Sequence, residues 1–403
     1  MAPFGGWDAL DGDPLSAPEQ PIGIARLAEL AFTGTDLKPL WRRLVDRYIA
    51  GKHEAASLMD LATLEQLFGN VEGGIAFQRA ALERRRLYRS PGQTKGASIR
   101  LLALAAPGDI GTNTPLEFLL QGSDIALETL YVIPGSPVPE SLPDFDIAIV
   151  AAGESAANRP VLDEIGRLAA SWNVPVLNDP RRVAALSRNG VAQMMQGIPQ
   201  LLAPLARRAD RAALDAIEAH ECPIIVRPIE SHAGRGLARI DRPEALAAYL
   251  RERPEDQFYV APFIDYRSAD GLYRKYRVAF IGGAPYACHM AIADQWMIYY
   301  LNAGMRESEA KRAEEARFMA EFDDGFARRH RSALGAIAER LGLDYVAIDC
   351  AEMPDGRLLL FEADIAMIVH AMDPPDLFPY KAPQMRKVFD AFRAMVKRRA
   401  ALA

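Results

Sequence analysis

A glycine-containing loop between two apolar runs is the first group of residues whose types and spacing suggest chemistry. The first run ends at Arg227, whose planar guanidinium can bind two phosphate oxygens at once. Gly234 and Gly236 in the loop would let backbone N–H groups approach an anion closely. Ser231 and His232 add side-chain donors. The loop therefore predicts a phosphate-binding site, and the alternative is an ordinary hairpin turn beside a solvated arginine.

Three acidic residues lie within apolar segments further along the chain. Glu362 and Asp364 are two apart and so share one face of a strand, and Asp349 precedes the turn sequence "PDG" at 354–356. A connecting loop of even length would place Asp349 opposite Glu362, whereas a three-residue loop would turn it to the other face. Converging carboxylates need a cation, and Mg²⁺ suits their oxygens. The alternative is an exposed edge hairpin, which the apolar residues around the acids disfavour.

Other sequence motifs for phosphate binding or catalysis are absent. The sequence has no G-x-x-x-x-G-K-[ST], and no G-x-G-x-x-G that opens a helix. It also lacks a G-x-S-x-G nucleophile motif and histidines at zinc-ligand spacing. The phosphate loop and the acidic cluster therefore remain the main candidates for a site.

The elements that must position these residues fall into three parts. Residues 24–88 show apolar residues at three- and four-residue spacing and no strand pattern, which predicts a small helical module ending in a single tetratricopeptide-like helix pair. After a linker at 89–97, strands alternate with helices, which predicts a Rossmann-like parallel sheet. Loops at 107–115 and 153–160 follow strand ends, so Asn113 and Glu154 are candidate substrate contacts.

The last part of the chain predicts mainly antiparallel structure. We expect a helical segment before the glycine loop, a strand at 257–265, a hairpin at 273–292, helices over 307–341 and a final hairpin. A closing helix is predicted over 387–399.

The ordered combination of glycine loop, intervening strand and acidic hairpin resembles the ATP-grasp superfamily over roughly residues 97–403. Within it, the sequence "YRKYRVAFIGGAPYACHMAI" is most similar to glutathione synthetase and to the enzymes that add glutamate to a ribosomal protein. The resemblance implies that Lys275, Arg277 and His289 are catalytic, and that Arg274 and Asn302 contact substrate, Asn302 alternatively serving as a metal ligand. It implies an ATP site made by Arg188, Arg227, Ser231, His232, Gly234, Gly236, Val260, Ala261, Phe263 and Asp265, and Mg²⁺ ligands Asp349, Glu362 and Asp364.

The sequence departs from the superfamily pattern at three of these positions. Arg227 stands where a lysine is usual, and Arg188 is the nearest counterpart of a second lysine. Asp364 replaces a usual asparagine and adds a charge, which should strengthen Mg²⁺ binding.

The resemblance implies an ATP- and Mg²⁺-dependent ligase that activates a carboxylate as an acyl phosphate and joins it to an amine. Two alternatives stay open, a small-molecule kinase and a non-catalytic ATP-binding interaction module. The expected α/β (α+β) organisation is a disordered tail at 1–23, the helical module at 24–96, a pre-grasp domain at 97–184 and an ATP-grasp domain at 185–403. Residues 203–262 of the last domain would form the lid that carries the glycine loop.

Composition limits the partners. The 403 residues carry a formal net charge of −6 with a pI near 5.7, which disfavours nucleic acid and anionic membranes as ligands. No apolar run has the roughly 20 residues that span a bilayer, no signal peptide is expected, and three separated cysteines indicate reduced thiols. We therefore expect a cytoplasmic protein with small-molecule or peptide carboxylate and amine substrates. The helical module could dock a protein, and a homo-oligomer stays open.

Overall fold

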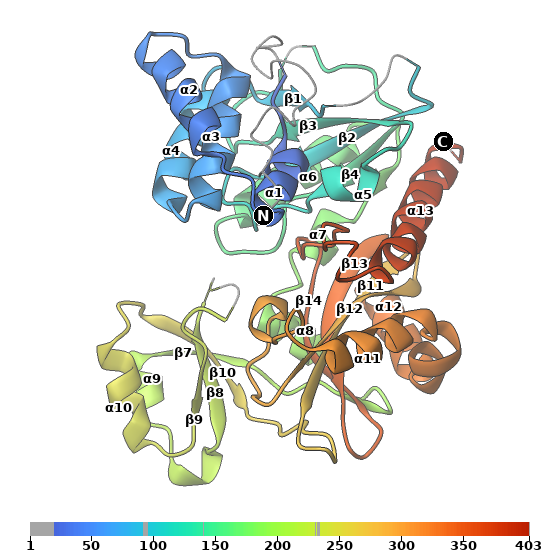
Figure 1. Cartoon of the computed structure of the whole chain (residues 1–403). Coiled ribbons are helices and arrows are strands. Elements are labelled where there is room, and N and C mark those ends of the chain that lie inside the picture. The colour runs from blue at the N-terminus through green and yellow to red at the C-terminus, as the bar shows by residue number, and fades with distance from the viewer. Residues whose placement is uncertain (1–19, 92–95, 140, 230, 232–233, 403) are drawn as a thin grey trace. The chain divides into compact units, whose positions relative to one another are not determined.

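The computed structural model describes residues 20–91, 96–139, 141–229, 231 and 234–402 (Figure 1). Contacts group them into two compact units, the first with residues up to 153, 157–183 and from 365 onward, the second with 154–156 and 184–364. None of the described helices has both the length and the apolar character needed to cross a membrane.

The first unit begins with the helical module. Its helices are α1 (Ile24–Phe32), α2 (Lys38–Ile49), α3 (Ala55–Leu67) and α4 (Val71–Leu82). Leucines recur at three- and four-residue spacing in α1, α2 and α3, and side chains such as Leu27, Leu40 and Leu61 meet in one core with no exposed surface. The tail predicted over residues 1–23 ends too late in the chain, because the backbone N–H groups of Ile22 and Gly23 donate to the Asp60 carboxylate. Residues 1–19 lie outside the described part.

A twisted sheet forms the other half of the first unit. Its strands are β1 (Leu87–Arg89), β2 (Ile99–Ala105), β3 (Ile125–Tyr131), β4 (Ile147–Val150) and β5 (Val176–Leu177), in the order β1-β3-β2-β4-β5. The predicted parallel pairing is confirmed for β3-β2-β4-β5. The expectation of no strand before residue 89 is wrong, because β1 pairs antiparallel with the edge of β3. The helices that accompany the sheet are α5 (Leu116–Leu120), α6 (Arg159–Ala170), α7 (Pro180–Val183) and α13 (Lys381–Ala400).

The contacts of α13 change the expected domain boundary. Residues 365–403 were expected in the ATP-grasp domain, but Arg393 donates to the carbonyl oxygen of Gln121, and Lys397 pairs with Asp124 at 2.7 Å. The C-terminal segment therefore belongs to the first unit by its contacts.

The second unit contains two sheets. One has the order β7-β10-β8-β9, from β7 (Arg207–Asp210), β8 (Ile224–Pro228), β9 (Ala238–Ile240) and β10 (Gln257–Pro262). Helices α9 (Arg211–Asp215) and α10 (Glu244–Arg251) pack on one face of this sheet, where Leu214, Leu246, Val226 and Phe258 form a core. The predicted antiparallel pairing of the strands on either side of the glycine loop is confirmed.

The other sheet of the second unit has the order β12-β11-β13-β14-β6. Its strands are β6 (Leu201–Leu202), β11 (Tyr273–Ile281), β12 (Ala284–Ala293), β13 (Tyr345–Glu352) and β14 (Leu358–Asp364), accompanied by α8 (Arg188–Met194), α11 (Glu309–Ala320) and α12 (Arg331–Leu341). Short 3₁₀ segments lie at Ala219–Glu221 and Tyr300–Asn302, and a π-helical turn at Asp323–Ala327 precedes α12. Both predicted hairpins of this sheet are confirmed.

Candidate active site

A buried carboxylate with two cations forms the centre of the candidate site. Lys275 and Arg277 are two apart on β11 and so point to the same face, as the sequence predicts. Arg277 lies opposite Asp349 of β13 in the strand register, and the Asp349 side chain has no exposed surface. Arg277 donates to Asp349 through Nε at 2.8 Å and Nη2 at 3.1 Å, and the Lys275 Nζ lies 2.7 Å from Oδ2. Burial alone would raise the pKa of Asp349, but the two cations hold it well below its ordinary range.

The hairpin of β13 and β14 brings Asp349 opposite Glu362, as predicted, but it does so without a connecting loop of even length. Residues 354–356 form a three-residue connection, closed by a hydrogen bond from the Met353 N–H to the Arg357 carbonyl oxygen at 2.8 Å. Of the two loop lengths that the sequence left open, the three-residue loop is therefore the one present. A β-bulge restores the register, because Cys350 pairs with Leu360 whereas Asp349 pairs with Glu362, leaving Phe361 as the extra residue.

Two further arginines surround Glu362. Arg188, the first residue of α8, forms an ion pair with Glu362 in which both side chains are largely buried. Burial would raise the pKa of Glu362, but the charge of Arg188 and further contributions from Lys275 and Arg227 lower it. Arg227 is 8% exposed, and burial together with the nearby charge of Arg188 lowers its pKa to about 10. Two guanidinium groups that repel each other in this way form a place for an anion.

The sheet with the glycine loop places two side chains beside Arg227 that the sequence analysis did not identify. Arg208 of β7, Tyr259 of β10 and Arg227 of β8 are direct neighbours across the strands and share one face. Arg208 donates to the Tyr259 hydroxyl at 3.3 Å, and its guanidinium lies 5.6 Å from the Tyr259 ring centre. Strand alternation around Arg227 could have suggested Tyr259, but Arg208 becomes visible only once the register of β7 is known.

The glycine loop is held by Arg227. The Arg227 Nε donates to the Ser231 hydroxyl at 3.1 Å, and the same guanidinium donates to the Ser231 carbonyl oxygen. Gly234 and Gly236 both have positive φ, and a Cβ at Gly236 would lie 2.7 Å from Cδ of Pro228. Glycine is therefore required at Gly236 for the turn to pack on its strand. The predicted donor His232 lies outside the described residues.

The residues expected near adenine have different environments. The Val260 side chain packs in the core on the helix-covered face of its sheet, so a side-chain contact to a ligand on the Arg227 face is excluded. Ala261 points to the same face as Tyr259. The Phe263 ring lies 4.0 Å from the Arg239 guanidinium, and Asp265 pairs with Arg267 at 2.8 Å. Their predicted roles in ATP binding stay predictions.

The three predicted metal ligands do not form a three-carboxylate site. Among the described residues, no group of three or more His, Cys, Asp or Glu side chains is arranged to hold a metal ion. The physical reason is that Arg277 and Lys275 occupy both oxygens of Asp349. Glu362 and Asp364 lie on the same face of β14, opposite Asp349 and Ala347, and both are partly buried.

Three predicted substrate contacts use their polar groups within the fold. Asn113 makes two hydrogen bonds to the backbone of Ala106, and the Asn302 side chain bonds to the backbone of residues 297 and 299. Arg274 points away from Lys275 and pairs with Asp270 and Glu314, which accounts for its charge. These side chains hold loops and helices in place, and their predicted substrate roles stay predictions.

Two other predicted residues lie beside side chains already described, His289 beside Arg277 and Glu154 close enough to Tyr259 to affect its pKa. His289 is the direct neighbour of Arg277 across β11 and β12, and its ring lies 4.9 Å from the Tyr300 ring. Glu154 belongs to the second unit and raises the pKa of Tyr259, although burial is the larger cause and the charge of Arg208 opposes both. The predicted catalytic role of His289 and the predicted substrate role of Glu154 stay predictions.

Comparison with known proteins gives matches among solved structures only. No protein-family model matches the chain, and no curated protein matches it in sequence. The VanG D-Ala:D-Ser ligase from Enterococcus faecalis is 13% identical over 74% of this chain and 99% of its own, with a TM-score of 0.47. A RimK-domain ATP-grasp protein from Sphaerobacter thermophilus is 18% identical (75% and 99%, TM-score 0.43), and the D-alanine–D-alanine ligase from Bacillus anthracis complexed with ATP is 12% identical (76% and 99%, TM-score 0.46).

The strand orders of this chain are decisive for its fold class. A small antiparallel sheet carries a glycine loop, and a second sheet carries paired cations and carboxylates on neighbouring strands, after a parallel sheet earlier in the chain. The chain has a mixed α/β fold with one largely parallel sheet and two largely antiparallel sheets. Six side chains of the second unit make up the candidate site, and we call them the charged cluster: Arg188, Arg227, Lys275, Arg277, Asp349 and Glu362.

Proposed function

We propose that the chain binds ATP with Mg²⁺ and uses it to join a substrate carboxylate to an amine. The observation that carries this proposal is the buried Asp349, held by Arg277 and Lys275 on one side and facing Glu362 on the other. Counting Asp364, the site has four cations and three carboxylates, so it favours an anion. Triphosphate chemistry consists mainly of such charge neutralisation and positioning.

The residues present fit Mg²⁺. This ion is commonly bound by one or two carboxylates, with phosphate oxygens and water completing its ligands. Glu362 and Asp364, which share a face of β14, would hold it. Mg²⁺ bound there would neutralise phosphate oxygens and polarise the bond to the transferred phosphoryl group.

The side chains of the charged cluster have separate tasks in this proposal. Arg227 and Arg188 bind phosphate oxygens, because their charges are close and partly uncompensated. Lys275 and Arg277 stabilise the negative charge that develops on the transferred phosphoryl group and on the acyl phosphate. Asp349 orients both cations and takes no part in bond making. The mechanism needs no side-chain nucleophile. The substrate carboxylate attacks the γ-phosphorus of ATP and ADP leaves, and the amine then attacks the acyl carbon, so that phosphate leaves and the amine loses a proton to solvent.

The first test is ATP affinity in Arg227→Met. Losing hydrogen bonds from a charged group costs about 1.5–3 kcal/mol, so we expect ATP to bind roughly 10- to 150-fold more weakly by calorimetry. Arg274→Met is the matched control, because Arg274 is also a largely buried strand arginine but pairs with Asp270 and Glu314. Equal ATP affinity in Arg227→Met and the native chain would remove the phosphate role.

The second test separates a ligase from the two alternatives. The chain is incubated with ATP, Mg²⁺, hydroxylamine and a panel of amino acids and short peptides. Hydroxamate formation identifies an acyl phosphate and supports the ligase. A phosphorylated product without hydroxamate would identify a kinase. ATP binding without turnover across the panel would support the non-catalytic ATP-binding module instead.

A further inference from the structure

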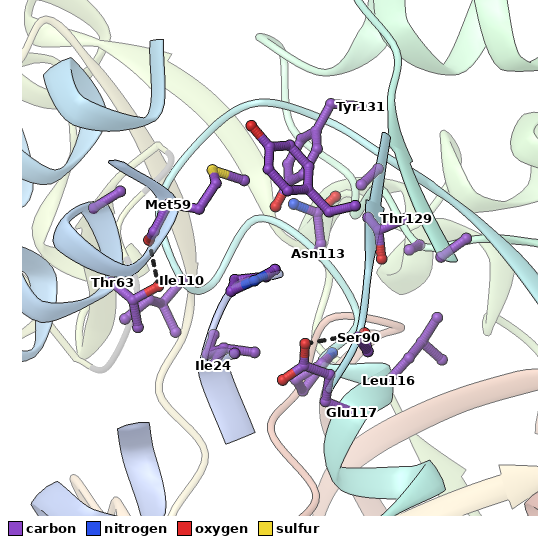
Figure 2. A pocket seen from close by; sticks show the side chains of 18 of the residues that line it. Ile24, Met59, Thr63, Ser90, Ile110, Asn113, Leu116, Glu117, Thr129 and Tyr131 are labelled. Carbon is purple, nitrogen blue, oxygen red and sulfur yellow. Dashed lines mark hydrogen bonds between the residues drawn. The ribbon is translucent and has the colours of Figure 1, made fainter. Parts of the chain in front are cut away.

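The first unit contains a cavity whose wall includes none of the residues of the charged cluster. Its volume is about 140 Å³, and it lies between helices α1, α3 and α4 on one side and strands β1, β2 and β3 on the other. The loop between β2 and α5 completes the wall. Figure 2 shows Ile24, Met59, Ile110 and Leu116 around it, with Thr129 and Tyr131 on the strand side. The wall is therefore partly apolar, with polar groups at defined places.

Two acidic side chains form part of this wall. Asp60 is 3% exposed, and its oxygens accept the N–H groups of Ile22 and Gly23. Glu117 accepts the N–H of Ala25 at 2.9 Å and the hydroxyl of Ser90 at 3.1 Å. Among the residues that the structure describes, neither acid has a Lys, Arg or His partner, and burial raises the pKa of both. The carboxylates thus lack a compensating cation.

The cations nearest to the cavity do not supply that compensation. Arg89 lines the cavity, but its guanidinium pairs with Glu128 at 2.7 Å and its side chain is 64% exposed. A third acid, Asp109, also lines the wall. An anion entering this space would meet carboxylates, whereas a cation would offset them.

Polar groups with unused hydrogen-bonding capacity also face the cavity. Gln78 is 8% exposed, and its Oε1 accepts the N–H of Gly108 at 2.8 Å. Its NH₂ group donates to no other described residue. The hydroxyls of Thr129 and Tyr131, two apart on β3, likewise have no partner within the described part of the chain. A ligand that fits has a cationic end for the acids and hydroxyls and an acceptor oxygen for Gln78.

We infer that this cavity binds a small primary amine that also carries a neutral acceptor oxygen, such as an amino alcohol. The ammonium donates to Asp60, Glu117 and the Tyr131 hydroxyl, and the oxygen accepts from Gln78. A cavity of about 150 Å³ holds a ligand of roughly six non-hydrogen atoms such as benzene, which limits the size of the amine. The inference is independent of ATP turnover.

The test compares two probes of equal size on the full chain at pH 8. 3-Aminopropan-1-ol carries the charge and the oxygen, and propane-1,3-diol replaces the ammonium by a hydroxyl. For so few atoms we expect a dissociation constant of roughly a millimolar for the amino alcohol and at least about 10-fold weaker binding of the diol by ligand-detected NMR titration. Equal binding of the two probes, or no binding of the amino alcohol at about 50 mM, would overturn the inference.

Two variants locate the binding. Thr129→Met fills the cavity from β3 and should weaken binding of 3-aminopropan-1-ol by at least about 10-fold. Thr33→Met makes the same change at the C-terminal end of α1, outside the cavity wall, and should leave binding unchanged. Undiminished binding in Thr129→Met would place the amine elsewhere and refute the site. If that variant does not fold, the comparison of amine and diol on the native chain decides.

Discussion

Asp349→Asn removes one negative charge from the centre of the charged cluster while almost conserving side-chain size. Asp349 is fully buried, and its two oxygens pair with Arg277 at 2.8 Å and Lys275 at 2.7 Å. The asparagine that replaces it has one acceptor oxygen and an NH₂ group that faces a cation. The variant therefore leaves at least one of the two cations without its partner.

The expected cost follows from the geometry. Unit charges about 4 Å apart attract by about 4 kcal/mol at an effective dielectric constant near 20. Removing one member of a buried ion pair typically costs about 3–5 kcal/mol, because the other member stays buried and unpaired. Since two cations share Asp349, we expect a loss of about 4–5 kcal/mol in the free energy of unfolding.

Urea unfolding of the native chain, Asp349→Asn, Arg277→Met and the double variant measures this cost. The double-mutant cycle should give a coupling free energy of about 2–3 kcal/mol between Asp349 and Arg277. Asp355→Asn is the matched control, because Asp355 lies in the same hairpin and its ion pair with Arg357 is about half exposed. That change should lower the free energy of unfolding far less than Asp349→Asn does.

The cost of Asp349→Asn, measured at two pH values, can refute this reasoning. The pKa of Asp349 is lowered, so its stabilising contribution is complete above the ordinary pKa of an aspartate and is lost only as the pH falls below it. The cost of Asp349→Asn should thus be the same at pH 6 and pH 8. A cost below about 1 kcal/mol, or one that changes between these two values, would show that the ion pairs do not hold the site.

Two more predictions concern other parts of the chain. Burial raises the pKa of Asp60 to about 7, so the folded state favours the neutral carboxyl group. As the pH rises from about 4 to about 7, Asp60 therefore lowers the free energy of unfolding by an amount that grows to about 4 kcal/mol. Asp60→Asn should therefore be more stable relative to the native chain at pH 8 than at pH 5 in urea unfolding. The opposite order would mean that the N–H groups of Ile22 and Gly23 stabilise the anion. Inserting one alanine after Phe361 should turn Glu362 and Asp364 to the opposite face and abolish ATP binding by calorimetry, whereas deleting Phe361 should keep Glu362 opposite Asp349 and retain binding. Retained ATP binding in the insertion variant would contradict the register argument.

Local periodicity accounts for the features that could be predicted from the sequence. The hairpins of the second unit each show apolar residues beside turn glycines, and the two-residue spacing of Lys275 and Arg277 places both on one face. The parallel sheet follows from alternating strands and helices. In each case the pattern that predicts the element repeats within a few residues of sequence.

Residues whose partners are distant in sequence could not be assigned in this way. Arg208 joins the face of Arg227 only through the pairing of β7, β10 and β8. Arg274 has the polar side chain expected of a substrate contact, but it pairs with Glu314, which is 40 residues further along the chain. A polar residue type in a loop or strand does not show whether the fold already satisfies it.

In the acidic hairpin, a three-residue turn and a β-bulge compensate for each other in the strand register. Gly356 has a φ of 85°, which suits a three-residue turn, and that turn alone would place Phe361 opposite Asp349. The bulge at Phe361 adds one residue to β14 only, so Glu362 returns to the face of Asp349. Because side chains alternate with a period of two, only the parity of the extra residues between the two acids matters. The turn sequence and the bulge must therefore change together in any chain that keeps this site.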